Sequence, residues 1–156
     1  MITISALPRD RVEEVLHLAL GPGQADFVGT IDEMVKDPLP TRDFHMVRDG
    51  AERVGFFKID RDYAAFHDFA DPLGWGLRGL LIGAQYQGRG LGRAMLAALP
   101  DYLKGHYPGQ RLYYLTVNCR NARAYTAYLS GGWTASGGLY HGGSSGPQHI
   151  LRLDLP

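Results

Sequence analysis

The segment Gln87-Gly88-Arg89-Gly90-Leu91-Gly92 has the residue types of an anion-binding loop. It lies between an apolar run at Leu77–Ile82 and a helical pattern that begins at Arg93. Glycine lets the backbone turn tightly and lets a ligand approach it closely. Free N–H groups at a helix N-terminus attract phosphate groups, and Arg89 and Arg93 add positive charge beside them. The segment predicts a pyrophosphate site, or else a turn that the glycines only shape.

Two well-known phosphate-binding loops fit this segment poorly. A Walker loop requires G-x-x-x-x-G-K-[ST], and no lysine follows the glycines here. The dinucleotide fingerprint requires G-x-G-x-x-G, whereas these glycines stand at positions 88, 90 and 92 and follow at least two expected antiparallel strands. A nucleotide-binding domain is therefore a weaker alternative.

A second motif follows at Asn121, and the two motifs together resemble the GNAT superfamily of N-acetyltransferases. The family's pyrophosphate segment reads [Q/R]-x-x-G-x-[G/A], and a later segment reads N-x-x-A-x-x-x-Y-x-x-x-G-[F/W]. The resemblance covers about residues 5 to 154, and the order of the expected elements also matches. The matching residues are Gln87, Gly90 and Gly92, followed by Asn121, Ala124, Tyr128, Gly132 and Trp133.

The resemblance implies acetyl-CoA as a co-substrate. In the family, backbone N–H groups of the glycine-rich loop hold the pyrophosphate, and the pantetheine arm pairs like an extra strand with the strand before the loop. A bulge usually splays that strand from the next one; Gly79 suits such a bulge, although a strand glycine also marks close packing. The cofactor-binding residues expected on this basis are Leu80, Leu81, Ile82, Gln87, Gly88, Arg89, Gly90, Leu91, Gly92, Arg93, Asn121 and Ala124.

Asn121 and Tyr128 each allow two interpretations. Asn121 would bond the pantetheine or a nearby backbone group, or it would cap the helix that follows, and the two roles are compatible. Helical spacing alone favours Tyr128 as a core aromatic. In the family, the matching tyrosine protonates the departing thiolate, and a phenol is a proton donor at neutral pH. The motif therefore favours Tyr128 as the catalytic acid.

The residue that takes the proton of an amine acceptor is left open by the sequence. Many family members use a Glu or Asp beside the cleft, or a water chain, and no Glu stands in the expected region. The candidates are His67, Asp68, Asp71 and His45, each of which also suits a surface or packing role. Cys119 lacks a histidine at a telling spacing and is expected to be structural. The six histidines show no metal-ligand spacing, so no metal is expected.

These residues need helices and strands to position them. Helices are expected over residues 12–20, 25–36, 93–104 and 121–130, and Pro100 is expected to kink or end the third one. Strands are expected over residues 43–48, 53–60, 77–82, 111–117, 133–136 and 149–153, with a hairpin turn at Asp49-Gly50. Residues 61–74 form a connection with a short helix or an irregular strand. Tyr140, His141 and His149 flank a Gly/Ser-rich loop that would border the acceptor.

The order of these elements predicts an α/β fold. The strand-helix-strand-helix stretch in the second half predicts a parallel strand pair, and the hairpins on either side predict an otherwise antiparallel sheet. We expect one mixed, mostly antiparallel sheet with helices on both faces and a splayed parallel pair, as in the GNAT family.

Composition limits the partners. The chain has 156 residues, which suits one domain over 1–156, with 16 basic and 16 acidic residues. This balance gives no bulk electrostatic support for a nucleic acid or an anionic membrane. A single cysteine excludes an intrachain disulfide and indicates the cytoplasm. We expect an N-acetyltransferase with a small-molecule or peptide amine acceptor, in a family where homodimers are common; the alternative is a non-catalytic acyl-CoA-binding module.

Overall fold

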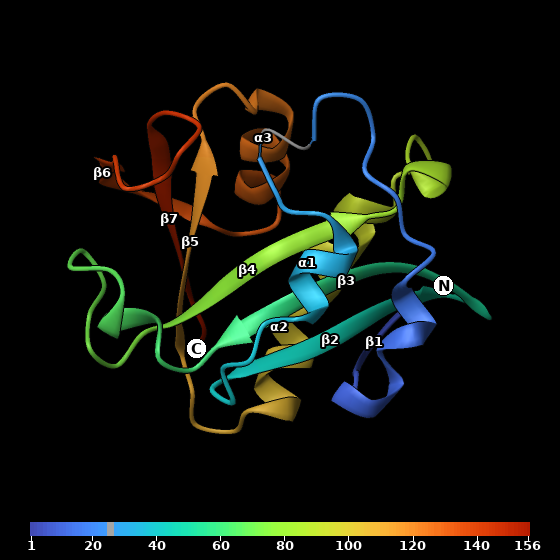
Figure 1. The fold of residues 1–156 in the computed structure, drawn as a ribbon. Helices are drawn as coiled ribbons and strands as arrows, with labels where there is room; N and C mark the ends of the chain where they lie inside the picture. Colours follow the sequence, from blue (N-terminus) through green and yellow to red (C-terminus); the bar gives the residue numbers. More distant parts are fainter. Residues whose placement is uncertain (25–26) are drawn as a thin grey trace.

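A computed structural model describes residues 1–24 and 27–156 of the chain. Their strands form one seven-stranded sheet in the order β1-β2-β3-β4-β5-β7-β6 (Figure 1). Every neighbouring pair is antiparallel except β4 and β5, which run parallel, so the expected mixed sheet is confirmed. The strands are β1 (Ile2–Ala6), β2 (Arg42–Asp49), β3 (Glu52–Asp60), β4 (Trp75–Ile82), β5 (Leu112–Asn118), β6 (Thr134–Tyr140) and β7 (Gln148–Asp154).

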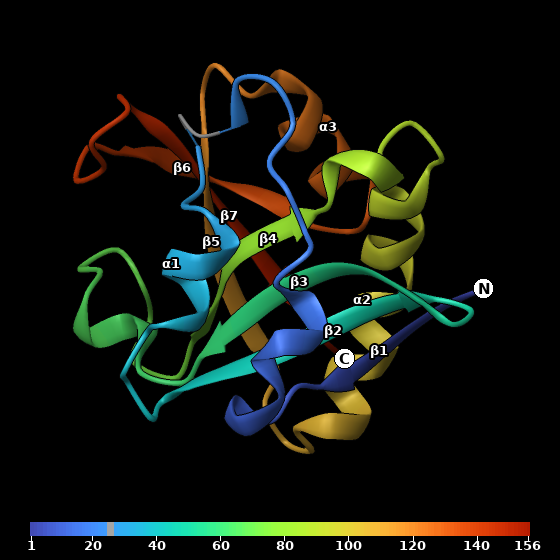
Figure 2. The same ribbon diagram turned by 45° about the vertical axis from the view of Figure 1, so that its right-hand side comes forward.

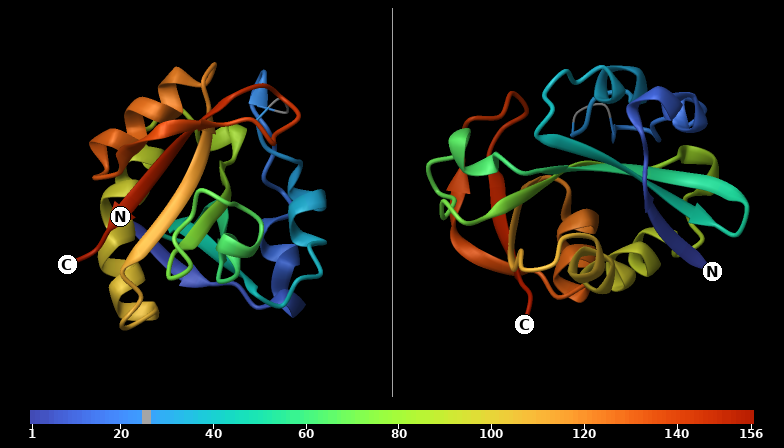
Figure 3. Two further views of the ribbon diagram at one scale, coloured as in Figure 1. Left: turned by 90° about the vertical axis from the view of Figure 1, so that its left-hand side faces the viewer. Right: turned by 90° about the horizontal axis from the view of Figure 1, so that it is seen from below.

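Helices cover both faces of this sheet. On one face lie α2 (Leu91–His106) and α3 (Ala122–Ser130); on the other lie the 3-10 helix η1 (Arg9–Val15) and α1 (Ile31–Val35) (Figure 3). The period-2 alternation of a strand supplies both cores from neighbouring residues. Phe57 packs in the cluster under α2, and Phe56 packs in the cluster under η1 and α1.

The parallel pair separates soon after it forms. β4 and β5 pair only at Trp75 with Tyr113 and at Gly76 with Tyr114. Further along β4, two residues stand opposite one residue of β3, and the first of them, Gly79, has a φ of +63°. This is a β-bulge, which bends its strand and increases the local twist. The expected splay and the proposed role of Gly79 in it are both confirmed.

The structure corrects the expectations for the N-terminal region. The edge strand β1, which lies beside α2 (Figure 2), was not expected. Its Ile2 and Ile4 alternate with polar residues and pack against the core cluster under α2. The helix expected over 12–20 is the short 3-10 helix η1, with a non-helical Arg11 inside it. Val15 is its buried residue, and Leu18, which follows the helix, packs in the same core.

The second expected helix is much shorter than 25–36. Its expected start, at Ala25 and Asp26, lies outside the described residues, and the helix itself is α1. Thr30 sets the start: its hydroxyl accepts the Glu33 N–H at 3.3 Å and donates to the Glu33 carboxylate at 3.0 Å. This reciprocal cap is a sequence signal, T-x-x-E, that the apolar spacing alone does not reveal.

Of the two outcomes expected at Pro100, a kink or a helix end, the structure excludes the helix end. α2 continues through it to His106. An internal proline costs about 3 kcal/mol, but five side chains of α2 are buried, and each buried leucine or methionine contributes roughly 1.5–3 kcal/mol. Burial therefore outweighs the lost hydrogen bond. In the described part of the chain, no helix is both long and apolar enough to span a membrane.

Candidate functional site

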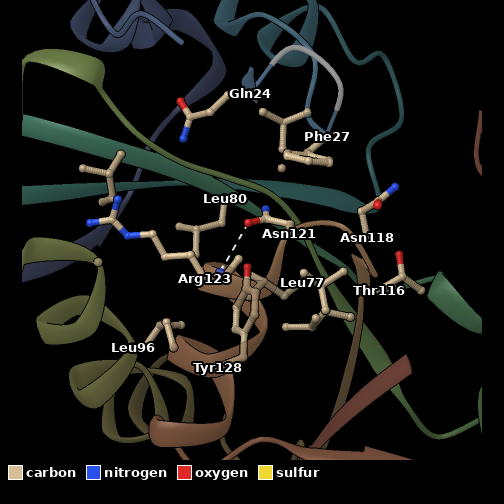
Figure 4. Close-up of a pocket in the computed structure, with 18 of the residues that line it drawn as sticks. Gln24, Phe27, Leu77, Leu80, Leu96, Thr116, Asn118, Asn121, Arg123 and Tyr128 are labelled. Carbon is tan, nitrogen blue, oxygen red and sulfur yellow. Dashed lines mark hydrogen bonds between the residues drawn. The ribbon is translucent and has the colours of Figure 1, made fainter. Parts of the chain in front are cut away.

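A cavity of about 620 Å³ lies where β4 and β5 separate. Its walls are the second half of β4, the glycine-rich loop, the first turns of α2 and α3, and β5 (Figure 4). Gln24 and Phe27 of the N-terminal region close it from above in that view. The bulge that splays the strands thus creates the space, and both sequence motifs border it.

The glycine-rich loop presents backbone to the cavity. Gly88 and Gly90 have φ values of +82° and +74°, and Gly90 is the N-cap of α2. Apart from its own helix backbone and chain neighbours, one described atom lies within 4 Å of the position of a Cβ at Gly92, namely Ile82 Cγ1 at 3.9 Å. The first hydrogen bond of α2 runs from Ala94 N–H to Gly90, so the earlier N–H groups have no acceptor within the helix. The loop has the free donors and the open space that an anion needs.

The edge of β4 beside the loop is also open. Leu80 and Ile82 line the cavity, whereas the Leu81 side chain is 1% exposed and packs on the opposite face. Beyond the two paired residues, β5 leaves this edge without a strand partner. Gln87 fastens the loop to the strand, because its Nε2 donates to the Ile82 carbonyl at 2.8 Å.

Helix α3 brings Asn121 and Tyr128 to the same cavity. Asn121 is its N-cap, with the side-chain oxygen accepting the Ala124 N–H at 3.3 Å, so the capping interpretation holds. Its other expected role remains a prediction. The Tyr128 hydroxyl points into the cavity below Leu80 (Figure 4), and its ring packs edge-on against Trp133. Burial raises the pKa of the Tyr128 phenol, so this group stays protonated and can donate.

Of the four candidate bases, only His67 lines the cavity among the described residues. Asp68 and Asp71 are exposed. His45 is sealed under α2, where its two ring nitrogens bond the hydroxyls of Tyr102 and Tyr107 at 2.7 and 2.9 Å. Burial lowers the pKa of His45 to about 3, so this imidazole is a neutral packing element.

One ring nitrogen of His67 is hydrogen-bonded, and the other has no hydrogen-bond partner among the described residues. Its Nδ1 lies 3.2 Å from the Tyr63 carbonyl oxygen. A carbonyl only accepts, so Nδ1 carries the proton and Nε2 keeps a lone pair. Burial lowers the pKa of His67, which keeps this nitrogen unprotonated near neutral pH.

The remaining expected residues divide between the cavity wall and its surroundings. Among the described wall residues are Gln87, Gly88, Gly90, Leu91, Gly92, Arg93 and Ala124. The Arg89 side chain is not among them and lies 3.8 Å from the Glu52 carboxylate. Cys119 also lies outside the wall, and the described residues contain no group of three or more His, Cys, Asp and Glu side chains that could hold a metal ion.

Sequence reasoning missed much of the end of the cavity that lies beyond the bulge. Tyr63, Arg78, Thr116 and Tyr140 line it. They come from four separate segments and share no spacing, so only the fold brings them together. The one local signal is that residues 61–74 are rich in aromatic side chains, but the sequence does not show that these side chains face the cavity. Of the expected acceptor border, Tyr140 and Gly143 are among the described lining residues of the cavity, whereas His141 and His149 are not.

Comparisons with known proteins identify the fold and the family model. Residues 13–132 match the model described as the acetyltransferase (GNAT) family. Among curated proteins, no match is found. Aminoglycoside acetyltransferase AAC(6')-Ib in complex with coenzyme A superposes with a TM-score of 0.77 at 17% identity, over 99% of this chain and 95% of that one.

Two further solved structures share the fold. The ribosomal-protein-S18-alanine N-acetyltransferase of Escherichia coli has a TM-score of 0.64 at 20% identity, over 100% of this chain and 94% of that one. A chimera of the spermidine N-acetyltransferase SpeG from Vibrio cholerae and hSSAT has a TM-score of 0.70 at 16% identity, over 98% and 95%. At these identities, the likeness extends to the fold alone.

Proposed function

The chain belongs to the acetyltransferase (GNAT) family, and on that premise we propose that it transfers an acetyl group from acetyl-CoA directly to a primary amine. The observation that carries the proposal is the meeting of two motifs at one cavity. The glycine-rich loop and the helix that bears Tyr128 border the space that the bulge opens.

The residues present fit acetyl-CoA in both charge and shape. The N–H groups at the start of α2 suit a pyrophosphate, and Arg93 and Arg123 place two cations at the same end of the cavity. The unpaired edge of β4 suits the pantetheine amides, which would pair with it as a strand does. Backbone N–H groups near Leu81 and Ile82 would polarise the thioester carbonyl.

In the proposed reaction, the amine nitrogen attacks the thioester carbon, a C–N bond forms and the C–S bond breaks. Tyr128 donates its proton to the departing sulfur, because a phenol with a raised pKa is protonated at the start. His67 accepts a proton from the amine at Nε2 as the C–N bond forms. The products are an N-acetyl amine and free CoA thiol. The protonated amine's extra proton passes to solvent, and His67 then loses its proton while Tyr128 regains one, which restores both side chains.

Thermal unfolding with acetyl-CoA, and with ADP as the control, tests the cofactor. Ligand at 100 times its dissociation constant stabilises the folded state by about 2.7 kcal/mol, which is several degrees for a domain of this size. We expect a shift with acetyl-CoA and little with ADP. The absence of a shift with acetyl-CoA would overturn the proposal, and a shift with acetyl-CoA without turnover of any amine would favour a non-catalytic binding module.

A further inference from the structure

The charged side chains on the cavity wall all have the same sign. Among the described residues that line it, the charged ones are Arg78, Arg93 and Arg123, and none is acidic. Arg93 and Arg123 lie in the first turns of α2 and α3, at the end of the cavity with the glycine-rich loop. Arg78 precedes the bulge on β4 and so faces the other end of the cavity, where an acceptor would enter. The proposed pyrophosphate accounts for the first two cations but not for Arg78.

Arg78 is held in place with part of its guanidinium free. Its Nε donates to Asp60 Oδ2 at 2.7 Å, and its Cζ lies 4.9 Å from the centre of the Tyr63 ring. Neither Nη atom donates to any described residue. A guanidinium fixed through Nε presents its two Nη groups as a planar fork, which matches the two oxygens of a carboxylate.

A buried charge network behind Arg78 carries a surplus positive charge. Asp37 accepts from Lys58 at 2.9 Å and from Arg42 at 3.0 Å, and Asp60 lies 3.3 Å from Arg42 Nε as well as bonding Arg78. Three cations thus share two carboxylates. Both carboxylate side chains are at most 6% exposed and that of Arg78 is 25% exposed, so solvent screens the excess only in part. Among the cations of the network, Arg78 is the one that lines the cavity.

The neighbouring imidazole responds to this charge. The pKa of His67 is lowered mainly by burial, and Arg78 lowers it further while Asp60 opposes that change. His67 stacks on Tyr63 with ring centres 4.0 Å apart, and Tyr140 lies beside it. The wall near Arg78 therefore combines a cation with aromatic faces and an uncharged imidazole.

We propose that the acceptor is a small amine that also carries a carboxylate, and that Arg78 binds this carboxylate through its Nη groups. This inference rests on the proposed function and adds the substrate class to it. A polycationic acceptor would meet the surplus positive charge of this network. The carboxylate would instead complete the pairing of the network and leave the amine to reach the thioester.

Matched acceptor pairs test the substrate class. Each pair is an amino acid and its carboxamide, for example phenylalanine and phenylalaninamide, with spermidine as a polycation and an aminoalkylphosphonate as a second anion. The amine of the carboxamide has the lower pKa, so a larger fraction of it is unprotonated at neutral pH, and without a carboxylate site the carboxamide would be the better acceptor. We expect kcat/KM at least about tenfold higher for the carboxylate member. Equal or higher values for the amides, a preference for spermidine or for the phosphonate, or no turnover of any carboxylate would overturn the proposal.

Variants then connect the preference to one side chain. Arg78→Met should lower kcat/KM, through KM, about tenfold more for the carboxylates than for the amides, and so remove the difference within each pair. Arg42→Met is the matched control: Arg42 also pairs with Asp60 but does not line the cavity. A preference that survives Arg78→Met, or one that Arg42→Met removes equally, would overturn the assignment. The thermal shift with acetyl-CoA is measured on the wild type and on each variant. The absence of a shift in the wild type would overturn the proposed function itself.

Discussion

The two ends of the cavity are built from different parts of the chain. At the glycine-rich end, backbone predominates: Gly88 and Gly90 have positive φ, and the edge of β4 is open. At the other end, side chains predominate, among them Arg78, His67 and Tyr63. Backbone N–H groups barely depend on residue type, whereas side chains can change without altering the fold. The first end suits a ligand common to a family, and the second suits an acceptor particular to one member.

The largest effect should come from Tyr128, which lies where the two ends meet. Tyr128→Phe removes one oxygen from a residue that packs against Trp133 and keeps the aromatic ring. We expect kcat to fall about 100-fold or more, the usual contribution of a positioned acid. The dissociation constant of acetyl-CoA should not change, because the loop and the β4 edge are untouched. Steady-state kinetics and a binding titration measure both; an unchanged kcat would refute the acid role.

The contrast between the two ends also explains what the sequence could show. The glycine-rich loop and the Asn121 motif are each one continuous segment, so the spacing within each motif is visible in the sequence. Both motifs lie at the cavity. Arg78 and Tyr140 are 62 positions apart in the sequence, and the sheet brings both to the wall of the same cavity. Local spacing cannot report such a meeting. The same limit left four candidate bases, which burial and position in the fold reduced to His67.

The second prediction concerns pH and tests the side-chain end. A neutral His67 is needed as the base, and its pKa lies below the ordinary 6.5. In the wild type, His67 therefore becomes protonated, and its contribution is lost, as the pH falls through that lowered value. His67→Gln should reduce kcat by up to about 100-fold at neutral pH. The ratio of wild-type to variant kcat should be constant above pH 6.5 and decline toward one in acid.

Taking the ratio removes the titration of the amine, which is the same in both proteins. A ratio that does not depend on pH would show that His67 acts only by packing on Tyr63. The acetyl-CoA dissociation constant is the internal control, because the histidine lies at the far end from the glycine-rich loop.

The third prediction tests the backbone end. Gly92 is helical, and a Cβ there would meet only Ile82 Cγ1, at 3.9 Å. Gly92→Val should therefore keep the fold yet place its side chain in the cavity, raising the acetyl-CoA dissociation constant about tenfold or more. Gly105→Val is the matched control, since Gly105 lies in the same helix, with no neighbour within 4 Å of its Cβ position. Equal affinities in the two variants would remove the loop from the cofactor site.

Elements of the fold were predictable where local patterns and tertiary packing agree. The β2–β3 hairpin follows from alternation and from Gly50, which has a φ of +61°. Pro100, where a kink or a helix end was expected, lies inside α2, because burial of this helix on the sheet outweighs the local cost of the proline. The β4 splay was expected from family resemblance and from Gly79, but its extent depends on pairing with β5, which no local pattern reports.

The smallest effect should come from Asn121, which is expected to contact the ligand through its side chain at the end of the cavity where backbone predominates. Its side-chain oxygen caps α3, and its side-chain amide N–H groups bond no described residue. Asn121→Ala should lower stability by about 1 kcal/mol through the lost cap, and it should raise the acetyl-CoA dissociation constant by about two- to tenfold if the amide donates to pantetheine. Asn121→Ser separates the two effects, because serine caps equally well but lacks the amide.

We expect Asn121→Ser to keep the wild-type unfolding temperature and to share the weaker acetyl-CoA binding of Asn121→Ala. The pair of variants therefore tells a structural cap from a ligand contact in one thermal scan and one titration. Wild-type affinity in the serine variant would instead mean that Asn121 only caps α3. The glycine-rich end would then recognise its ligand through backbone and the charges of Arg93 and Arg123, and the difference between the two ends would be sharper still.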